Sequence, residues 1–158
     1  MSALVLKPGE GRAVGVVGDV YTVKTSGKET GGAYSVMEAL VPPLGGPPPH
    51  RHAREAEAFY VLEGEMEFIA DGQRSVGSAG TWVSLPKGSL HRFRNIGDTP
   101  ARMLILIVPA GLEEFFLEVG LDAGMIAADE PATIDPRQIE KMLATAPKYG
   151  LEIVPLEH

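Results

Sequence analysis

The sequence predicts an all-β domain, a jelly-roll barrel built from two sheets, followed by a short helical segment. The first observation is that residues 1–108 consist largely of short runs in which apolar side chains alternate, which is the period of a half-buried strand. The second is that turn residues separate these runs, since the 158-residue chain holds 19 glycines and 13 prolines. The third is a change to helical spacing of the apolar residues after Pro109.

The alternating runs give about ten strands. In the run at 34–41, Ser35, Met37 and Ala39 share one face, and the residues between them share the other. The run at 101–108 is apolar on both faces apart from Arg102, so we expect it to be covered on both sides. The expected strands cover residues 3–7, 12–17, 20–25, 34–41, 57–62, 65–71, 73–76, 81–85, 90–96 and 101–108, and a polar turn is expected at 26–32.

Two helices are expected after these strands. Residues 112–119 place four apolar side chains on one stripe. Asp135-Pro136 is a typical helix start, so a second helix should run to about Thr145. The organisation predicted is a barrel domain over residues 1–110 with a helical extension over 111–158 packed on it. Three side chains of the second helix should face inward: Ile139, Met142 and Leu143.

Composition and charge argue against several function classes. The net charge is −7 without a basic run, which disfavours nucleic acid and an anionic membrane surface as partners. The absence of cysteine excludes disulfides and cysteine-based zinc sites. No apolar run approaches the ~20 residues of a membrane span, and the N-terminus lacks a signal-peptide pattern, so a cytoplasmic protein is expected. Leu156, Glu157 and His158 resemble the start of an affinity tag and are left out of the functional reasoning.

Three of the four histidines fall in two short stretches, one of which also carries a glutamate. His50 and His52 are two residues apart, so in a strand they point to the same face, and Glu57 follows after a turn. His91 lies on a later strand. Three imidazoles and one carboxylate are a ligand set for a first-row divalent metal. We therefore expect these four residues to bind one metal per chain, with one or two coordination positions left open.

These residues lie in two motifs that resemble those of the cupin family. The first cupin motif consists of a glycine, His-x-His, a glutamate and a second glycine. The chain fits it at His50, His52, Glu57 and Gly64, but Leu44, followed by Gly45 and Gly46, holds the place of the leading glycine. The second motif consists of a glycine, Pro-x-Gly, a histidine and an asparagine, and it matches at every fixed position: Gly80, Pro86, Gly88, His91 and Asn95.

The stretch EAFYVLEGEMEF resembles bacterial single-domain cupins of the quercetin-dioxygenase-like group. The resemblance implies the cupin double-stranded β-helix. It also implies that Glu57 can leave the metal and act as a general base, and a permanent ligand role for Glu57 is the alternative.

The ligand set suits iron, manganese, nickel, copper, cobalt or zinc, and the order of affinities does not choose among them. Apolar neighbours on the same strand faces would form the walls of a pocket. No inward arginine or lysine is evident, so a small acid would lack a cation partner and an apolar aromatic substrate is expected. The expected substrate-binding residues are Phe59, Phe68, Phe93, Trp82, Met37 and Met103.

Three function classes compete on this basis. The first is a metal-dependent dioxygenase of the quercetin type that acts on a flavonol, another polyphenol or a polyketide. The second is a non-oxidative enzyme, such as an isomerase, cyclase or decarboxylase, and the third is a small-molecule-binding protein without turnover. Apolar surface at Tyr60, Leu62 and the strand 101–108 predicts a homodimer, and cover by the C-terminal helices is the alternative.

Overall fold

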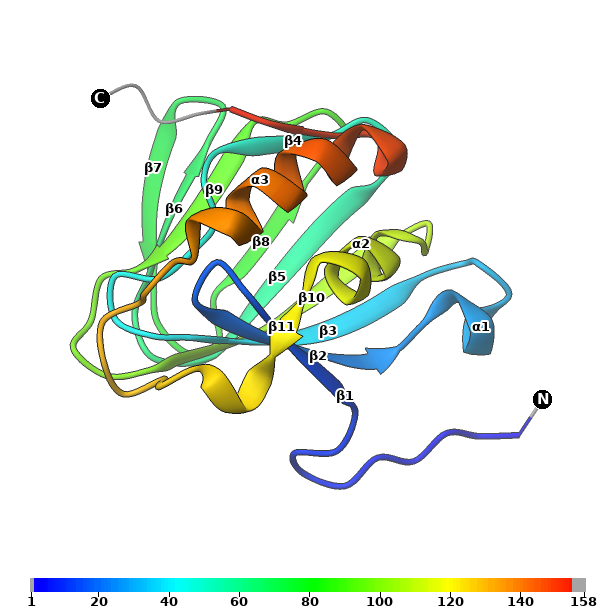
Figure 1. The fold of residues 1–158 in the computed structure, drawn as a ribbon, viewed down its shortest axis with the longest axis horizontal. Coiled ribbons are helices and arrows are strands. Elements are labelled where there is room, and N and C mark those ends of the chain that lie inside the picture. Colours follow the sequence, from blue (N-terminus) through cyan, green and yellow to red (C-terminus); the bar gives the residue numbers. More distant parts are fainter. Residues whose placement is uncertain (1, 155–158) are drawn as a thin grey trace.

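Two antiparallel sheets face each other in the computed structural model, which describes residues 2–154 (Figure 1). The larger sheet has seven strands in the order β11-β1-β2-β3-β10-β5-β8, and the smaller has five in the order β12-β4-β9-β6-β7. This arrangement is the expected all-β, double-stranded β-helix with a short helical segment near the C-terminus. The tag-like residues 156–158 lie outside the described residues.

Apart from β11, for which no strand was predicted, the strands of the larger sheet follow the predicted runs closely. They are β1 (Arg12–Val16), β2 (Asp19–Thr25), β3 (Ser35–Val41), β5 (Ala56–Glu63), β8 (Trp82–Leu85), β10 (Ala101–Val108) and β11 (Leu121–Asp122). Those of the smaller sheet are β4 (His50–His52), β6 (Met66–Ala70), β7 (Gln73–Gly77), β9 (His91–Asn95) and β12 (Leu151–Ile153).

Alternation of side chains builds the core between the sheets. In β3 every second residue from Ser35 to Val41 is buried, as predicted, and β10 shows the same pattern from Ala101 to Ile107. The opposite face of β10 is half-buried rather than fully covered. We expected β10 to be covered on both sides, but within one chain only its inner face is fully buried.

Two N-terminal expectations are wrong. Residues 3–7 form no strand and are mostly exposed, because the edge of β1 that is not paired with β2 is paired with β11. The polar turn at 26–32 contains a four-residue helix, α1 (Gly27–Thr30). A capping box starts this helix: the Ser26 hydroxyl accepts from the backbone of the first turn, and the Glu29 carboxylate accepts from the Ser26 N–H.

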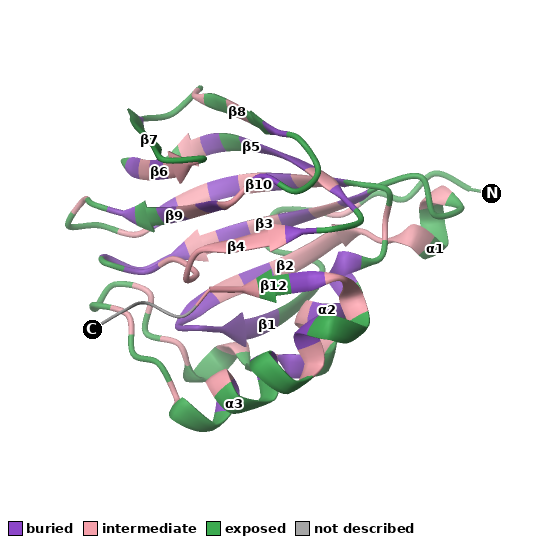
Figure 2. Cartoon of the chain, turned by 90° about the horizontal axis from the view of Figure 1, so that it is seen from above, coloured by how far each residue is buried: buried purple, intermediate pink, exposed green. Residues whose placement is uncertain are grey.

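The C-terminal segment, residues 112–153, contains α2 (Leu112–Val119), α3 (Pro136–Thr145) and two 3-10 turns, Ala123–Met125 and Ala146–Tyr149. Both helices match their predicted bounds, and the Asp135 carboxylate caps α3 by accepting from the Arg137 N–H at 2.9 Å. The segment is not purely helical, because β11 and β12 each add a strand to one of the sheets. Figure 2 shows both helices gathered beside β1 and β12.

Helix α3 is fixed to the barrel mainly by a residue that the apolar pattern could not identify. The buried Gln138 amide accepts from the Val17 N–H at 2.9 Å and donates to the carbonyl oxygens of Gly15 and Val119 at 2.8 and 3.1 Å. Met142 is buried as expected, whereas the expectation for Leu143 is wrong, since it is 45% exposed. The helix turns its Gln138–Met142 stripe inward, and Leu143 lies beyond that stripe.

Within residues 2–154, the helices are all too short or too polar to cross a membrane. The cytoplasmic location expected from the sequence stays a prediction.

Candidate metal centre

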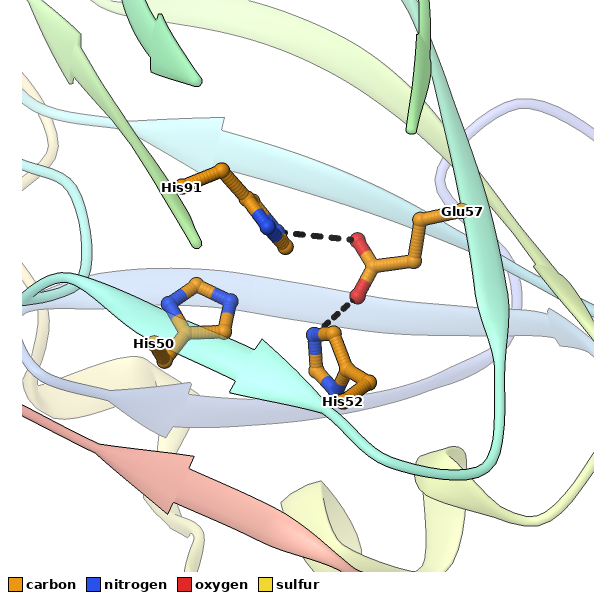
Figure 3. A group of neighbouring side chains, drawn as sticks. All are labelled: His50, His52, Glu57 and His91. Carbon is orange, nitrogen blue, oxygen red and sulfur yellow. Dashed lines mark ion pairs between the residues drawn. The ribbon is translucent and has the colours of Figure 1, made fainter. Parts of the chain in front are cut away.

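The two sheets bring one side-chain cluster together between them (Figure 3). His50 and His52 come from β4 and His91 from β9, so the smaller sheet supplies all three imidazoles. Glu57 comes from β5 of the larger sheet. Each of the four offers a ligand atom that lies within 4.8 Å of the others. We call these four residues the ligand cluster.

Pairing of strands places the imidazoles side by side. His50 lies directly opposite His91 in the antiparallel β4–β9 pair, and their ring centroids are 4.4 Å apart. The centroids of His50 and His52, two residues apart on the same face, are 4.9 Å apart. The approach of three like side chains therefore follows from backbone register alone.

The loop before β4 keeps its shape although the leading glycine of the first motif is absent. Leu44 adopts φ 65°, the left-handed conformation that a glycine would adopt at lower cost. The loop is tied to β9 in both directions, because Leu44 N–H donates to the Asn95 carbonyl and Asn95 N–H to the Gly45 carbonyl, each at 2.9 Å. A side chain at Gly46 would overlap the Phe93 carbonyl oxygen. The substitution leaves the ligands of β4 in place.

Two imidazoles are oriented by backbone carbonyls. The Nδ1 atoms of His50 and His91 lie 2.9 Å from the carbonyl oxygens of Pro48 and Ser89, respectively, and a neutral ring donates its proton there. Such an outer hydrogen bond fixes the tautomer and leaves Nε2 for a metal. Nε2 of His91 is buried and has no hydrogen-bond partner among the described residues.

His52 and Glu57 form a closer pair. Nε2 of His52 contacts Glu57 Oε1, and the second oxygen, Oε2, lies 3.8 Å from His91 Nε2. Burial alone would lower the pKa of His52, but the Glu57 carboxylate raises it above its usual value. Burial would raise the pKa of Glu57, yet His52 and the two other imidazoles bring it below its usual value. Without a metal, both shifts favour a proton on His52 and a negative charge on Glu57.

The pKa values of the other two histidines are lowered, and His50 is kept neutral. Burial, followed by the neighbouring His91 and His52, lowers the pKa of His50 to about 3. Neutral imidazoles and an ionised carboxylate are the protonation states that bind metals. With ligand atoms that all lie within 4.8 Å of one another and a buried His91 Nε2 without a hydrogen-bond partner among the described residues, the cluster fits a divalent transition metal held by all four residues.

A cavity of about 40 Å³ adjoins the ligand cluster. Its lining residues are Val16, Val17, Tyr21, Met37, Pro47, Pro48, His50, His52, Glu57, Phe93, Ile105, Ile107, Leu112, Phe115, Phe116, Met142, Leu151 and Ile153. Among these, only Tyr21 carries a polar side-chain atom besides the three cluster members, and none carries an amine or guanidinium group.

The six residues expected to bind substrate lie in the cavity wall, in the core or on the outer surface. Met37 and Phe93 line the cavity. Phe59, Phe68 and Met103 are buried in the core beside it, and they are not among the lining residues. Trp82 lies outside: it is 58% exposed and pairs with Tyr60 on the outward face of the larger sheet. The expectation for Trp82 was wrong because β8 turns its Leu85 face inward.

Part of the cavity wall was not predicted from the sequence. Tyr21 falls within a predicted strand, but the pattern of that strand did not show which face turns inward. Leu151 and Ile153 lie in β12, a three-residue strand without a turn signal of its own. Glu55, in the loop after β4, is buried with one carboxylate oxygen unpartnered among the described residues, and its charge adds to the raised pKa of His52.

Two facing antiparallel sheets with three imidazoles and a carboxylate converging between them define a β-barrel protein with a site capable of binding a metal. Residues 37–108 match the family model for the cupin domain. The chain belongs to the cupin superfamily, and within it resembles the quercetin-dioxygenase-like group.

Two curated relatives carry the same name. The chain is 28% identical over 116 residues to quercetin 2,3-dioxygenase of Bacillus subtilis and 32% identical over 119 residues to that of Aspergillus japonicus. These alignments cover 73% and 71% of the chain. The chain spans about one third of the length of these relatives, since each alignment covers 34% of the relative.

Solved structures support the fold. A predicted oxalate decarboxylase of Thermotoga maritima superposes with a TM-score of 0.63 at 22% identity, over 67% of this chain and 99% of that one. The polyketide cyclase RemF of Streptomyces resistomycificus superposes with a TM-score of 0.60 at 23% identity, over 68% of this chain and 80% of that one.

Proposed function

We propose that this protein is a metal-dependent dioxygenase that acts on a flavonol-like or related polyphenolic molecule. The observation that carries the proposal is that a cluster of three imidazoles and one carboxylate opens onto a cavity whose other walls are almost entirely apolar. Similarity to two quercetin 2,3-dioxygenases supports the same reaction class.

One divalent transition metal per chain is the proposed cofactor, held by the ligand cluster. When bound, it supplies a Lewis acid for adjacent substrate oxygens and, if redox-active, electrons for dioxygen. Iron, manganese, nickel, copper, cobalt and zinc all suit this nitrogen and oxygen ligand set. The redox-active members of the series fit the proposed reaction.

The residues that line the cavity carry no guanidinium or ammonium group, and this affects which substrates can bind. A small dianion brought into this cavity would lose its hydration without gaining a guanidinium or ammonium partner from the lining residues. Met37 and Phe93 instead offer apolar contact to a flat ring. An aromatic substrate with two adjacent oxygens therefore fits better than a small acid.

Glu57 is proposed as the proton acceptor. Its carboxylate is buried, ionised and part of the cavity wall, so it can take the hydroxyl proton as a substrate binds beside it. The alternative role, a permanent ligand, predicts equal losses of metal and activity on substitution. Glu57→Gln separates the two roles, because an acceptor needed in the transition state lowers kcat more than it weakens substrate binding.

The cavity is small for a polyphenol. Its volume of about 40 Å³ holds only one or a few waters. Sites for drug-sized molecules have about 300–1,000 Å³. Binding of a flavonol therefore requires the wall to open, and α2, α3 and β12 form part of that wall.

A second function class is a non-oxidative reaction such as a cyclisation. The His52–Glu57 pair, which holds one mobile proton beside an apolar cavity, is suited to moving a proton between carbon and oxygen. The fold is shared with a polyketide cyclase. A third class, ligand binding without turnover, would use the same walls.

The test uses protein purified without chelators, with its metal content measured. Quercetin is added without oxygen, and oxygen is then admitted while absorbance and dissolved oxygen are followed. The proposal expects loss of the flavonol band with oxygen consumption. Loss of a polyketide or catechol substrate without oxygen consumption would establish the non-oxidative class. If neither quercetin nor these compounds are converted, the third class, ligand binding without turnover, is favoured.

We also propose a homodimer. Tyr60 and Trp82 are 41% and 58% exposed on the outer face of the larger sheet, with ring centroids 6.4 Å apart. The C-terminal helices do not cover this pair. An exposed apolar patch of this kind is typical of a protein contact. Light scattering at micromolar concentration should return about twice 16.8 kDa, and the monomer mass would contradict the proposal.

A further inference from the structure

Tyr21 is the one lining residue that carries a polar side-chain atom and does not belong to the ligand cluster. It extends from β2 of the larger sheet, and its side chain is 2% exposed. The ring packs against Phe116 of α2, with centroids 4.6 Å apart. The phenol is therefore held between the barrel and the C-terminal segment, beside the space that a substrate would enter.

A buried carboxyl group holds the phenol. Asp19 lies two residues earlier on the same face of β2, is fully buried, and has Oδ2 3.0 Å from the Tyr21 Oη. Its second oxygen, Oδ1, faces the backbone of Gly45 and Gly46 and makes no hydrogen bond of normal geometry among the described residues. A Cβ at Gly45 would lie only 2.7 Å from this oxygen, so the loop before β4 leaves room for the carboxyl group.

The surroundings make Asp19 a neutral acid. Burial raises the pKa of Asp19 to about 8, and the hydrogen bonds from Tyr21 and Gly46 only partly oppose that rise. In the structure the Tyr21 hydroxyl donates to Asp19 Oδ2. A carboxyl group protonated on that oxygen can instead donate to the Tyr21 oxygen, which leaves the phenol hydrogen for another acceptor. Burial is the largest cause that raises the pKa of Tyr21 well above its usual value, so the phenol keeps its proton.

A purely structural role explains this pair poorly. Two apolar side chains of similar size would fill the same volume without the desolvation cost of a carboxyl group and a hydroxyl. Paired polar groups on an otherwise apolar wall are the usual means by which a small-molecule site fixes orientation.

We propose that Tyr21 donates a hydrogen bond to the substrate inside the cavity, in addition to the contacts made at the ligand cluster, and that Asp19 is the positioning residue that keeps the phenol proton available for it. This inference rests on the proposed function and extends it by naming a second anchor. The substrate then carries oxygen at two places: an adjacent pair at the ligand cluster and a separate acceptor at Tyr21.

The test compares two probes that share a chelating pair and differ in the rest of the molecule. Unsubstituted flavonol has no further hydroxyl groups, whereas quercetin has several. Binding of each to the metal-loaded protein is followed without oxygen by the shift of the flavonol absorption band. Tyr21→Phe should weaken quercetin binding by about threefold to tenfold, the worth of one hydrogen bond, and leave unsubstituted flavonol within about twofold.

Variants of Asp19 show whether it acts through Tyr21. Asp19→Asn keeps a donor beside the phenol and should bind quercetin like the parent protein. Asp19→Leu removes that donor and should reproduce the selective loss of Tyr21→Phe. The matched control is Tyr34→Phe, because Tyr34 is 42% exposed outside the cavity and should change neither probe. Melting curves and metal content confirm that each variant is folded and loaded.

Equal losses for both probes, or no loss for quercetin, overturn the inference, because damage to the fold does not distinguish the probes. If neither flavonol binds the parent protein, the same comparison is made with catechol and protocatechualdehyde, which differ by a remote carbonyl. Failure of this pair to bind, or equal losses with it, also overturns the inference. Binding without oxygen consumption would contradict only the proposed dioxygenase, since Tyr21 is assessed by binding alone.

Discussion

The ligand strands and the C-terminal segment enclose the same cavity but differ in how they are specified. His50, His52 and Glu57 lie within eight residues of each other, and their spacing alone predicts a shared face. Residues 112–153 carry no comparable motif and lie outside the matched family region, which ends at residue 108. They nevertheless supply Leu112, Phe115, Phe116, Met142, Leu151 and Ile153 to the wall. Local spacing thus predicts the ligand cluster, whereas a separate segment supplies much of the apolar wall.

The two regions are joined by backbone pairing. Strand β12 pairs with β4 so that Leu151 lies opposite His52 and Ile153 opposite His50. Beyond the strand ends, Ala53 N–H donates to the Gly150 carbonyl and Val154 N–H to the Pro49 carbonyl, both at 2.8 Å. On its other side, β4 has a single register pair, His50 with His91. The segment without a motif is therefore the main lateral support of the strand that carries two ligands.

The largest expected effect comes from removal of the metal. A ligand bound only by the folded state at about a thousand times its Kd stabilises that state by about 4 kcal/mol. For a chain of this size, that corresponds to a fall in Tm of about 8–16 °C on chelation. Calorimetry with and without chelator measures it, and hydrogen exchange should increase in β12 as well as in β4. Faster exchange confined to β4 would show that the two regions are independent.

A substitution in the segment should affect stability without affecting the metal. Met142 is 5% exposed, and Met142→Ala should cost about 2–5 kcal/mol in the free energy of unfolding and enlarge the cavity. The Kd for metal should stay within about threefold, while kcat/KM for a bulky flavonol rises. Leu143→Ala is the matched control, because this exposed neighbour should cost less than about 0.5 kcal/mol. Denaturant titration and metal titration together decide the outcome.

The reverse pattern is expected in the ligand strand. His52→Ala removes one of four ligands and should weaken metal binding by at least about a hundredfold, the upper end of what loss of an outer partner costs. Metal analysis after gel filtration measures this, with Arg51→Ala as control, because Arg51 points away from the cluster. Unchanged metal content in His52→Ala would refute the assignment of the metal centre.

The smallest expected effect is a pH dependence of metal affinity. The Glu57 carboxylate raises the pKa of His52 above its usual value, so a metal ion must displace a proton from His52 once the pH falls below that raised pKa. His50 stays neutral down to about pH 3 and contributes nothing in this range. Cobalt titrations in buffers of falling pH should show a Kd rising about tenfold per unit, the response to one displaced proton. A steeper rise would mean that more than one imidazole competes with the metal for protons.

The sequence predicted much of the fold because the decisive signals were local. The alternation of side chains along the strands predicted β3 and the inward orientation of His52, Phe59 and Phe93. The pair Asp135-Pro136 predicted the start of α3. The errors concern long-range pairing. The apolar run at 3–7 found no partner strand, and the outward turn of Trp82 depends on its register with Tyr60.

The same limit applies to the site. The ligand cluster could be predicted from spacing, because three of its members are close in sequence and the fourth lies in a second motif. The Asp19–Tyr21 pair and the β12 wall could not be predicted, because each depends on a contact with a distant segment: the loop at Gly45 in one case and β4 in the other.

The pairing of β12 with β4 also affects how the protein matures during synthesis. His52 and its partner Leu151 are 99 residues apart, and a ribosome adds about 5–20 residues per second. For about 5–20 seconds, the nascent chain therefore presents both β4 histidines on a strand that has not received its main partner. An ion captured in that interval would meet a looser site than the finished barrel provides. The support of β4 by β12 is complete only after Ile153 has emerged and paired opposite His50.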